Sequence, residues 1–253
     1  MNREELIANL RCLRLPTMAV DYLETARQCE KVKNTHEQYL ACLVTAEVDK
    51  KRYVRIQRRI KEAQIKIPKR LGTYDYSCRK GITAEQVGRL ALCDFVRKAA
   101  NVVFYGPFGV GKSHLATGLT IAACEAGYRC LWRSTQEMVA ELVKAHRTLT
   151  LSPLLKKLDG FDLICLDELG YTPQTAEGAD LFFQFISQRY ERRSLVITTN
   201  LTYSEWDKVF LSPMATAAAV DRIIHNCETY NISGPSWRAE EAKKRTQQST
   251  KSN

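Results

Sequence analysis

A glycine-rich segment near the middle of the chain has the residue types and spacing of a phosphate-binding loop. Residues 106–113 read GPFGVGKS and match the pattern G-x-x-x-x-G-K-[ST]. Glycines let such a loop wrap around phosphates with its N–H groups pointing inward, the lysine reaches the β- and γ-phosphates, and the following hydroxyl binds Mg²⁺. The sequence therefore predicts an ATP site with Mg²⁺. The residues expected to contact the nucleotide are Gly106, Pro107, Phe108, Gly109, Val110, Gly111, Lys112, Ser113 and His114.

Two adjacent carboxylates follow an apolar segment that reads FDLICL. A buried strand there would deliver Asp167 and Glu168 to the carboxyl end of a sheet, where ligands bind in α/β folds. We expect Asp167, with Ser113, to hold Mg²⁺, and Glu168 to act as the base that polarises an attacking water. The alternative is that the two carboxylates only cap the next element. An acidic residue directly after the metal aspartate favours hydrolysis over transfer of the phosphoryl group to a small molecule.

A third apolar segment, SLVITTN, ends at Asn200. At the end of a neighbouring strand, this amide would be placed to hydrogen-bond the attacking water or the γ-phosphate. The alternative is an ordinary turn residue at the end of a strand.

These segments belong to a region in which short apolar strands alternate with helices. From residue 101 to residue 238 the pattern predicts an α/β domain with a mainly parallel five-stranded sheet and right-handed crossovers. Residues 1–67 predict a small helical domain in which Pro16 breaks or restarts a helix and a long helix covers about 35–67. Residues 68–100 are expected to form a linker and one helix, at 83–96, with Thr83 as its N-cap. The polar residues 239–253 are expected to be disordered.

The positive charge of the chain is concentrated in one segment. The formal net charge is +10, and residues 50–70 hold ten Lys and Arg against the single acidic residue Glu62. Such a stripe is typical of proteins that bind nucleic-acid phosphates, whatever the base sequence. The alternative is a solvated helix face that keeps the protein in solution. The residues expected to contact duplex DNA are Lys51, Arg52, Arg55, Arg58, Arg59 and Lys66.

Composition argues against membranes, disulfides and zinc. No apolar run approaches the roughly 18–20 residues of a membrane span, and the N-terminus lacks the apolar core of a signal peptide. The nine cysteines include no CxxC pair, and the four histidines show no metal-ligand spacing. We therefore expect a cytoplasmic protein.

The order of several sequence blocks resembles a known family. GPFGVGKSHLA, FDLICLDELGY, FFQFISQRYERRSLVITTN and AVDRIIH look like the IstB-like transposition helper ATPases of the AAA+ class, which are close to the DnaC-type helicase loaders. The resemblance runs from LRLPTMA near the start to GPSWR near the end. One departure is the phosphate loop, which reads PFGVGK where the family usually has PPGTGK.

The resemblance implies a homo-oligomer that assembles on DNA, with ATP at subunit interfaces, and that assists a transposase. In this family's pattern Lys112 and Ser113 are the Walker A residues, Asp167 and Glu168 are Walker B, and Asn200 is sensor 1. Arg222 matches the arginine supplied in trans to a neighbour's γ-phosphate. Arg238 matches a sensor 2 arginine that contacts the nucleotide. Other candidates for the trans arginine are Arg189, Arg192 and Arg193.

Three other functions share parts of this pattern. A replicative helicase loader would have the same ATPase core. A DNA-binding scaffold would use ATP only to set its oligomeric state. A small-molecule P-loop kinase would leave both the basic segment and Asn200 without a role.

Overall fold

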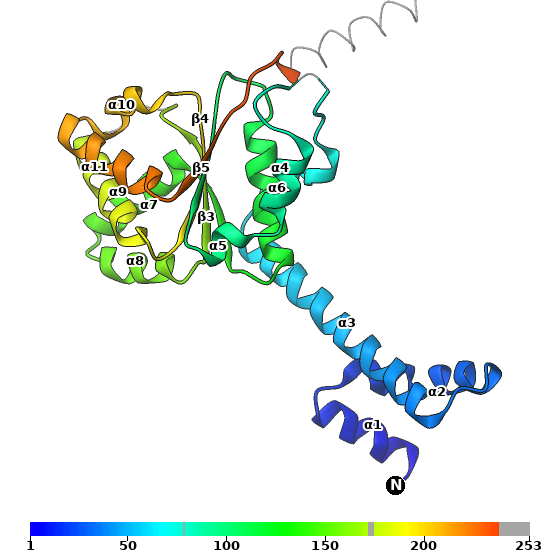
Figure 1. Ribbon diagram of the computed structural model, residues 1–253. Helices are drawn as coiled ribbons and strands as arrows, with labels where there is room; N and C mark the ends of the chain where they lie inside the picture. The colour runs from blue at the N-terminus through cyan, green and yellow to red at the C-terminus, as the bar shows by residue number, and fades with distance from the viewer. Residues whose placement is uncertain (78, 172–174, 238–253) are drawn as a thin grey trace, which may run out of the picture. The chain divides into compact units, whose positions relative to one another are not determined.

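The chain is divided into two compact units that meet in sequence between Arg58 and Arg59. The computed structural model, shown in Figure 1, describes residues 1–77, 79–171 and 175–237. The predicted tail at 239–253 lies outside the described residues. Within the described ranges no helix combines the length and the apolar composition that crossing a bilayer requires.

The N-terminal unit is helical. Asn2 and Glu5 cap the first helix by accepting each other's backbone N–H groups. Pro16 occupies the first turn of the second helix, where its missing N–H costs nothing, so it restarts a helix as expected. The buried carboxylate of Glu47 accepts the backbone N–H of Met18 at 3.0 Å, which joins the third helix to the start of the second. The helices are α1 (Arg3–Cys12), α2 (Pro16–Lys31) and α3 (His36–Glu62), whose last residues belong to the second unit.

The second unit is built on a five-stranded sheet with the order β2-β3-β4-β1-β5. Every pairing between these strands is parallel, so the predicted mainly parallel sheet is confirmed. The central strands β1, β3 and β4 are buried along almost their whole length, as their continuous apolar composition requires. The strands are β1 (Asn101–Tyr105), β2 (Cys130–Ser134), β3 (Leu163–Leu169), β4 (Ser194–Thr199) and β5 (Cys227–Asn231).

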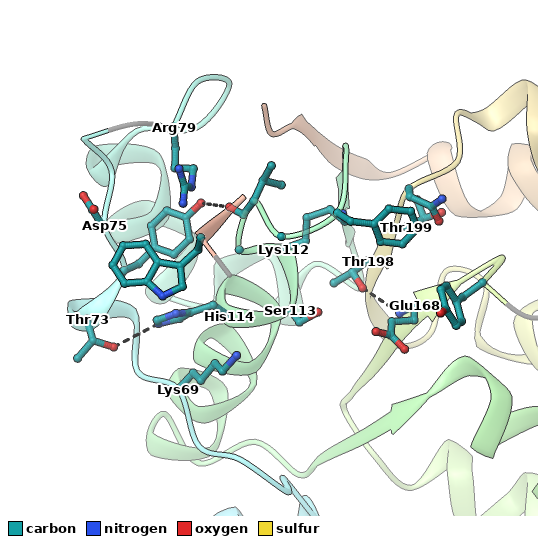
Figure 2. Close-up of a pocket in the computed structure, with 18 residues that line it drawn as sticks. Lys69, Thr73, Asp75, Arg79, Lys112, Ser113, His114, Glu168, Thr198 and Thr199 are labelled. Carbon is teal, nitrogen blue, oxygen red and sulfur yellow. Dashed lines mark hydrogen bonds between the residues drawn. The ribbon is translucent and has the colours of Figure 1, made fainter. Parts of the chain in front are cut away.

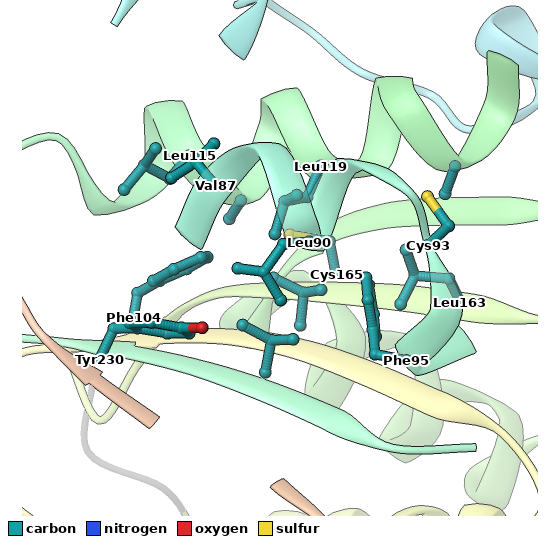
Figure 3. Packing of buried hydrophobic residues seen from close by; sticks show 14 of the residues in the cluster. Val87, Leu90, Cys93, Phe95, Phe104, Leu115, Leu119, Leu163, Cys165 and Tyr230 are labelled. Atoms are coloured by element: carbon teal, nitrogen blue, oxygen red, sulfur yellow. The ribbon is translucent and has the colours of Figure 1, made fainter. Parts of the chain in front are cut away.

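Helices cover both faces of this sheet (Figure 1). On one face α4 (Ala84–Ala91), α5 (Asp94–Arg97) and α6 (Lys112–Glu125) supply apolar side chains to one core. Figure 3 shows Leu90 of α4 and Leu119 of α6 above Cys165 of β3. A second core fills the other face. Its helices are α7 (Thr135–Arg147), α8 (Leu151–Asp159), α9 (Ala176–Arg189), α10 (Asp207–Phe210) and α11 (Pro213–Ile224).

The predicted domain boundary at residue 67 and the predicted linker at 68–100 need correction. The long helix ends at Glu62, because the next residue, Ala63, is fully buried and its carbonyl accepts the N–H of Trp132 in edge strand β2 at 2.8 Å. Gln64 then takes a left-handed backbone, with φ of 57°. The described residues between 59 and 100 therefore pack on the sheet as part of the second unit.

The single helix predicted at 83–96 is two helices. Thr83 caps α4 as expected, exchanging hydrogen bonds with Gln86. The helix ends at Ala91 because Cys93 adopts a left-handed backbone, with φ of 59°, and α5 starts anew at Asp94. The short helix α8 was not expected from the sequence.

Candidate functional site

The phosphate loop connects β1 to α6, and the side chain of Tyr74 packs against it. Gly111 is the N-cap of α6 with φ of 98°, and a Cβ on it would lie 2.6 Å from the ring of Tyr74. The Tyr74 hydroxyl donates to the carbonyl of the buried Val110 at 3.1 Å. Burial raises the pKa of Tyr74 to about 12, so it stays a neutral donor. Glycine and tyrosine together fix the turn from which α6 begins.

Lys112 lies at the mouth of this loop. Its ammonium donates to the carbonyls of Gly106 at 2.7 Å and Pro107 at 2.8 Å, and it lies 5.9 Å from the ring centroid of Phe108. Because Lys112 is the first residue of α6, the N-terminus of this helix, with its positive dipole end, also lies at this mouth. The combination of an ammonium group and a helix N-terminus favours an anion.

Asp167 and Glu168 lie within the last residues of β3, and a bulge in the sheet places their carboxylates. Leu166 pairs with Ile197 and Leu169 pairs with Thr199, so the ladder shifts between them. Within this bulge Glu168 has φ of 61°, a left-handed conformation that costs a non-glycine residue roughly 1–2 kcal/mol. Bulges re-aim side chains next to active sites. Here the bulge exposes Glu168 to the pocket while Asp167 stays buried, with 6% of its surface accessible.

A hydroxyl of β4 holds both acidic residues. Thr198 donates to the Asp167 carboxylate and accepts the backbone N–H of Glu168 at 2.9 Å. The neighbouring Thr199 donates to the carbonyl of Leu169 at 2.8 Å. Figure 2 shows Thr198 beside Glu168, across the pocket mouth from Ser113. The end of β4 therefore fixes the geometry of the carboxylates at the end of β3.

These elements enclose a pocket with a volume of about 480 Å³. It brings together four of the predicted catalytic and metal residues: Lys112, Ser113, Glu168 and Asn200. Ser113 and Glu168 supply a hydroxyl and a carboxylate to the pocket, while Asp167 does not line it and lies buried against Thr198. Such hard oxygen donors are the type that Mg²⁺ prefers, so the residue types present fit this ion. The volume lies within the range of about 300–1,000 Å³ that is typical of small-molecule sites.

His114 also lines this pocket, on the side away from Glu168. Its Nε2 atom lies 2.9 Å from the carbonyl of Arg70 and 3.2 Å from the hydroxyl of Thr73. The ring also packs edge-on against Tyr74. These contacts tie the start of α6 to the chain segment before α4.

Sequence reasoning missed several residues that line the pocket. Thr198 and Thr199 were visible as the TT before Asn200, where alternate side chains of a strand end point to opposite faces. Tyr171 lies in an edge-to-face contact with Phe108, with ring centroids 6.1 Å apart, and no sequence pattern indicated this pair. Apart from His114, the end of the pocket away from Glu168 was missed, because most of it comes from the residues before α4, for which the sequence predicts a linker. The missed residues are Lys69, Thr73, Tyr74, Asp75, Arg79 and Trp237.

Arg222 does not line the pocket of its own chain. It lies on α11, where its guanidinium donates to the Ala218 carbonyl at 3.0 Å and lies 5.0 Å from the ring centroid of Phe183. Arg238 lies outside the described residues.

The alternative arginines occupy the opposite edge of the sheet, where β4 begins. Arg189 is 2% exposed, donates to three carbonyls including that of Ser194, and has its pKa lowered to about 9 by burial. Arg192 pairs with Asp159 at 2.6 Å, and Arg193 bonds to the carbonyl of the same residue at 3.1 Å. All three hold the end of α9 and the residues after it to the end of α8 and the residues that follow α8.

Most of the predicted DNA-contacting residues lie on α3. Arg52, Arg55 and Arg59 recur at helical spacing and therefore share one face of this helix. Lys51 forms an ion pair with Glu47 at 3.5 Å. Lys66 lies beyond the end of α3 and pairs with Glu137 of α7.

Comparison with known sequences matches this chain to one family over nearly its whole length. The model of the IstB-like ATP binding protein family matches residues 8–246. The chain belongs to this family. An insertion-sequence ATP-binding protein of Sinorhizobium fredii is 36% identical over 231 residues, covering 91% of this chain and 78% of that protein. The ATP-binding protein of insertion sequence IS21 from Pseudomonas aeruginosa is 32% identical over 241 residues, covering 95% of this chain and 90% of its own.

Solved structures share the fold of a large part of this IstB-like chain. The DnaC helicase loader superimposes with a TM-score of 0.53 at 22% identity, covering 65% of this chain and 96% of that one. DnaI superimposes with the same TM-score at 20% identity, covering 66% and 89%. The predicted family and the predicted fold are therefore confirmed, and the chain is a member of the IstB-like ATP binding proteins.

Proposed function

We propose that this IstB-like protein is an ATPase that assembles as a homo-oligomer on target DNA and assists a transposase. The observation that carries the proposal is the convergence of Lys112, Ser113, Glu168 and Asn200 on one pocket. The names of the relatives, which are ATP-binding proteins of insertion sequences, support the connection to transposition.

The geometry supports hydrolysis as the reaction. Lys112 and the N-terminus of α6 would bind the phosphates, and Ser113 and Asp167 would hold Mg²⁺, which would supply positive charge to offset that of the phosphates. Glu168, exposed by its bulge, would orient a water for attack, and Asn200, which follows β4, lines the same pocket. The same acidic residue has no comparable role in a scaffold that binds ATP without turnover.

Lys112→Ala is expected to weaken ATP binding by about 100-fold or more. The variant lacks the ammonium group of Lys112, which is the cationic side chain of the GKS motif and is expected to contact the phosphates. Titration of the variant with Mg·ATP measures this directly. Lys98→Ala, which removes an exposed lysine after α5, serves as the charge-matched control. Equal ATP affinity in Lys112→Ala and the wild-type protein would rule out nucleotide binding at this loop.

Measurement of phosphate release then separates hydrolysis from the scaffold alternative. We expect duplex DNA to raise the rate in the wild-type protein, because assembly on DNA brings subunits together around the nucleotide. A protein that binds ATP tightly but releases no phosphate, with or without DNA, would be the scaffold.

The basic face of α3 is proposed as the DNA contact. Changing Arg55, Arg58 and Arg59 together to Ala should lower affinity for duplex DNA of any sequence. It should also reduce the slope of log K against log salt by about 0.9 for each DNA phosphate that the variant no longer neutralises. Binding measured at several salt concentrations on two unrelated duplexes tests both expectations.

The control for this variant removes the same charge elsewhere in the N-terminal unit. Unchanged affinity and slope in the α3 variant, or the same loss in the control, would show that α3 does not contact the phosphates. The control residues are Arg3, Arg11 and Arg27, all exposed on α1 and α2.

A further inference from the structure

The pocket has two chemically different ends. Lys112, Ser113 and Glu168 define a phosphate end, where an ammonium, a hydroxyl and a carboxylate meet. The other end lies away from the carboxylates at the end of β3 and is lined by Thr73, Tyr74 and neighbouring residues of the segment before α4. Figure 2 shows Thr73, Asp75 and Arg79 on the opposite side of Ser113 from Glu168. A nucleotide whose triphosphate lies against Lys112 and Ser113 places its base at this second end.

Aromatic side chains are the groups that proteins use to bind the flat face of a base. Tyr74 faces inward, with its hydroxyl on the Val110 carbonyl, and is 8% exposed. Its ring face is therefore covered by the loop and by its contacts with Tyr76 and His114. Trp237, by contrast, lines the pocket with 40% of its surface accessible. Its indole therefore offers the pocket a large accessible aromatic surface.

Trp237 is brought to the pocket by residues 232–237, which we call the strap. After β5 the strap is fixed at its start by the Ile232 N–H, which donates to the Tyr105 carbonyl at 2.8 Å. Ser233 and Lys80 exchange backbone hydrogen bonds of 2.9 and 3.1 Å. These bonds hold the strap against the segment that leads into α4.

The far end of the strap is fixed to the phosphate loop itself. The Trp237 N–H donates to the Gly109 carbonyl at 3.0 Å. Gly109 has φ of 79°, and a Cβ on it would lie only 2.1 Å from the hydroxyl of Ser236. Only glycine at this loop position permits such a close approach. The phosphate loop and the strap are therefore in direct contact. This contact places Trp237 next to the ligand that the loop would bind.

We propose that Trp237 forms the base-binding wall of this site, and that the strap covers the nucleotide base. The proposal rests on ATP binding at this pocket, as proposed above. Stacking on an indole recognises the face of the base and not its edge, so Trp237 supplies affinity for a nucleoside and leaves base identity to the polar residues nearby.

The experiment compares two ligands that share a triphosphate and differ in the base: Mg·ATP and Mg·tripolyphosphate. Trp237→Ala is expected to lower affinity for ATP by about tenfold, which corresponds to about 1.4 kcal/mol. Affinity for tripolyphosphate should stay within about twofold. Trp237→Phe, which keeps an aromatic face, should recover most of the loss. Ser233→Ala is the control on the same strap, because Ser233 does not line the pocket and is joined to Lys80 through its backbone, which the substitution keeps.

Each outcome has one meaning. Equal ATP affinity in Trp237→Ala and the wild-type protein would overturn the proposal, as would an equal loss of ATP and tripolyphosphate, since the strap would then serve only the loop. A thermal unfolding midpoint close to that of the wild-type protein shows that a selective loss is not caused by misfolding. Failure of the wild-type protein to bind either ligand would instead remove the proposed ATP site itself.

Discussion

Glu168→Gln is expected to hydrolyse ATP at least about 100-fold more slowly than the wild-type protein while binding ATP with nearly the same affinity. The amide keeps the shape of the side chain but cannot act as a base, and a positioned base contributes roughly 10²–10⁴-fold to such reactions. The bulge and the Thr198 hydrogen bond to the Glu168 N–H depend on the backbone, so the substitution leaves them intact. Phosphate release and ATP titration measure the two quantities.

The same variant should also accumulate as an ATP-loaded oligomer on DNA, because assembly needs bound ATP and release needs hydrolysis. Glu177→Gln is the matched control: Glu177 lies on α9 and pairs with Arg147 outside the pocket. If Glu168→Gln left DNA as readily as the wild-type protein, hydrolysis would not be the step that releases the complex.

Arg222→Ala is expected to lower the hydrolysis rate by about 10³-fold, the lower end of the range for an arginine that stabilises the transition state from a neighbouring subunit. Arg222 lies on α11 and does not line the pocket of its own chain, so the proposed role is toward a neighbour's nucleotide. Arg192→Ala removes an exposed arginine at the other edge of the sheet and is the control.

Mixing two inactive variants tests whether Arg222 acts in trans. A subunit with Lys112→Ala still carries Arg222, and a subunit with Arg222→Ala still carries an intact phosphate loop. At some interfaces of a mixed oligomer, Arg222 of the Lys112→Ala subunit will face the intact phosphate loop of the Arg222→Ala subunit. The mixture should therefore regain a measurable part of the wild-type hydrolysis rate. If the mixture stays as inactive as its components, Arg222 does not serve the neighbouring site.

The phosphate end of the site was predictable from sequence because its residues belong to short motifs that are contiguous in the chain. The pattern from Gly106 to Ser113 is contiguous, and Asp167 and Asn200 each follow an apolar strand, so the parallel sheet brings them to one edge. What local patterns cannot show is the bulge at Glu168 or the hydroxyl of Thr198 that holds both carboxylates. Those depend on the pairing of β3 with β4.

The base end and the domain boundary were not predictable for a related reason. The residues between 68 and the helix predicted at 83–96 have few apolar residues at regular spacing, so their pattern predicts a linker. Their order comes from long-range contacts, such as the Tyr74 hydroxyl on the Val110 carbonyl and the bridge between Lys80 and Ser233. Trp237 is a single aromatic residue after the last strand, and its position depends on the hydrogen bond between its N–H and the Gly109 carbonyl.

The most direct test of the account is the mass of the protein on a duplex DNA fragment, measured by sedimentation with ATP, with ADP and without nucleotide. The account predicts a larger complex with ATP than in the other two conditions, and the disappearance of this difference in Lys112→Ala. One mass in all three conditions, in protein shown to bind ATP, would contradict the claim that bound ATP joins neighbouring subunits.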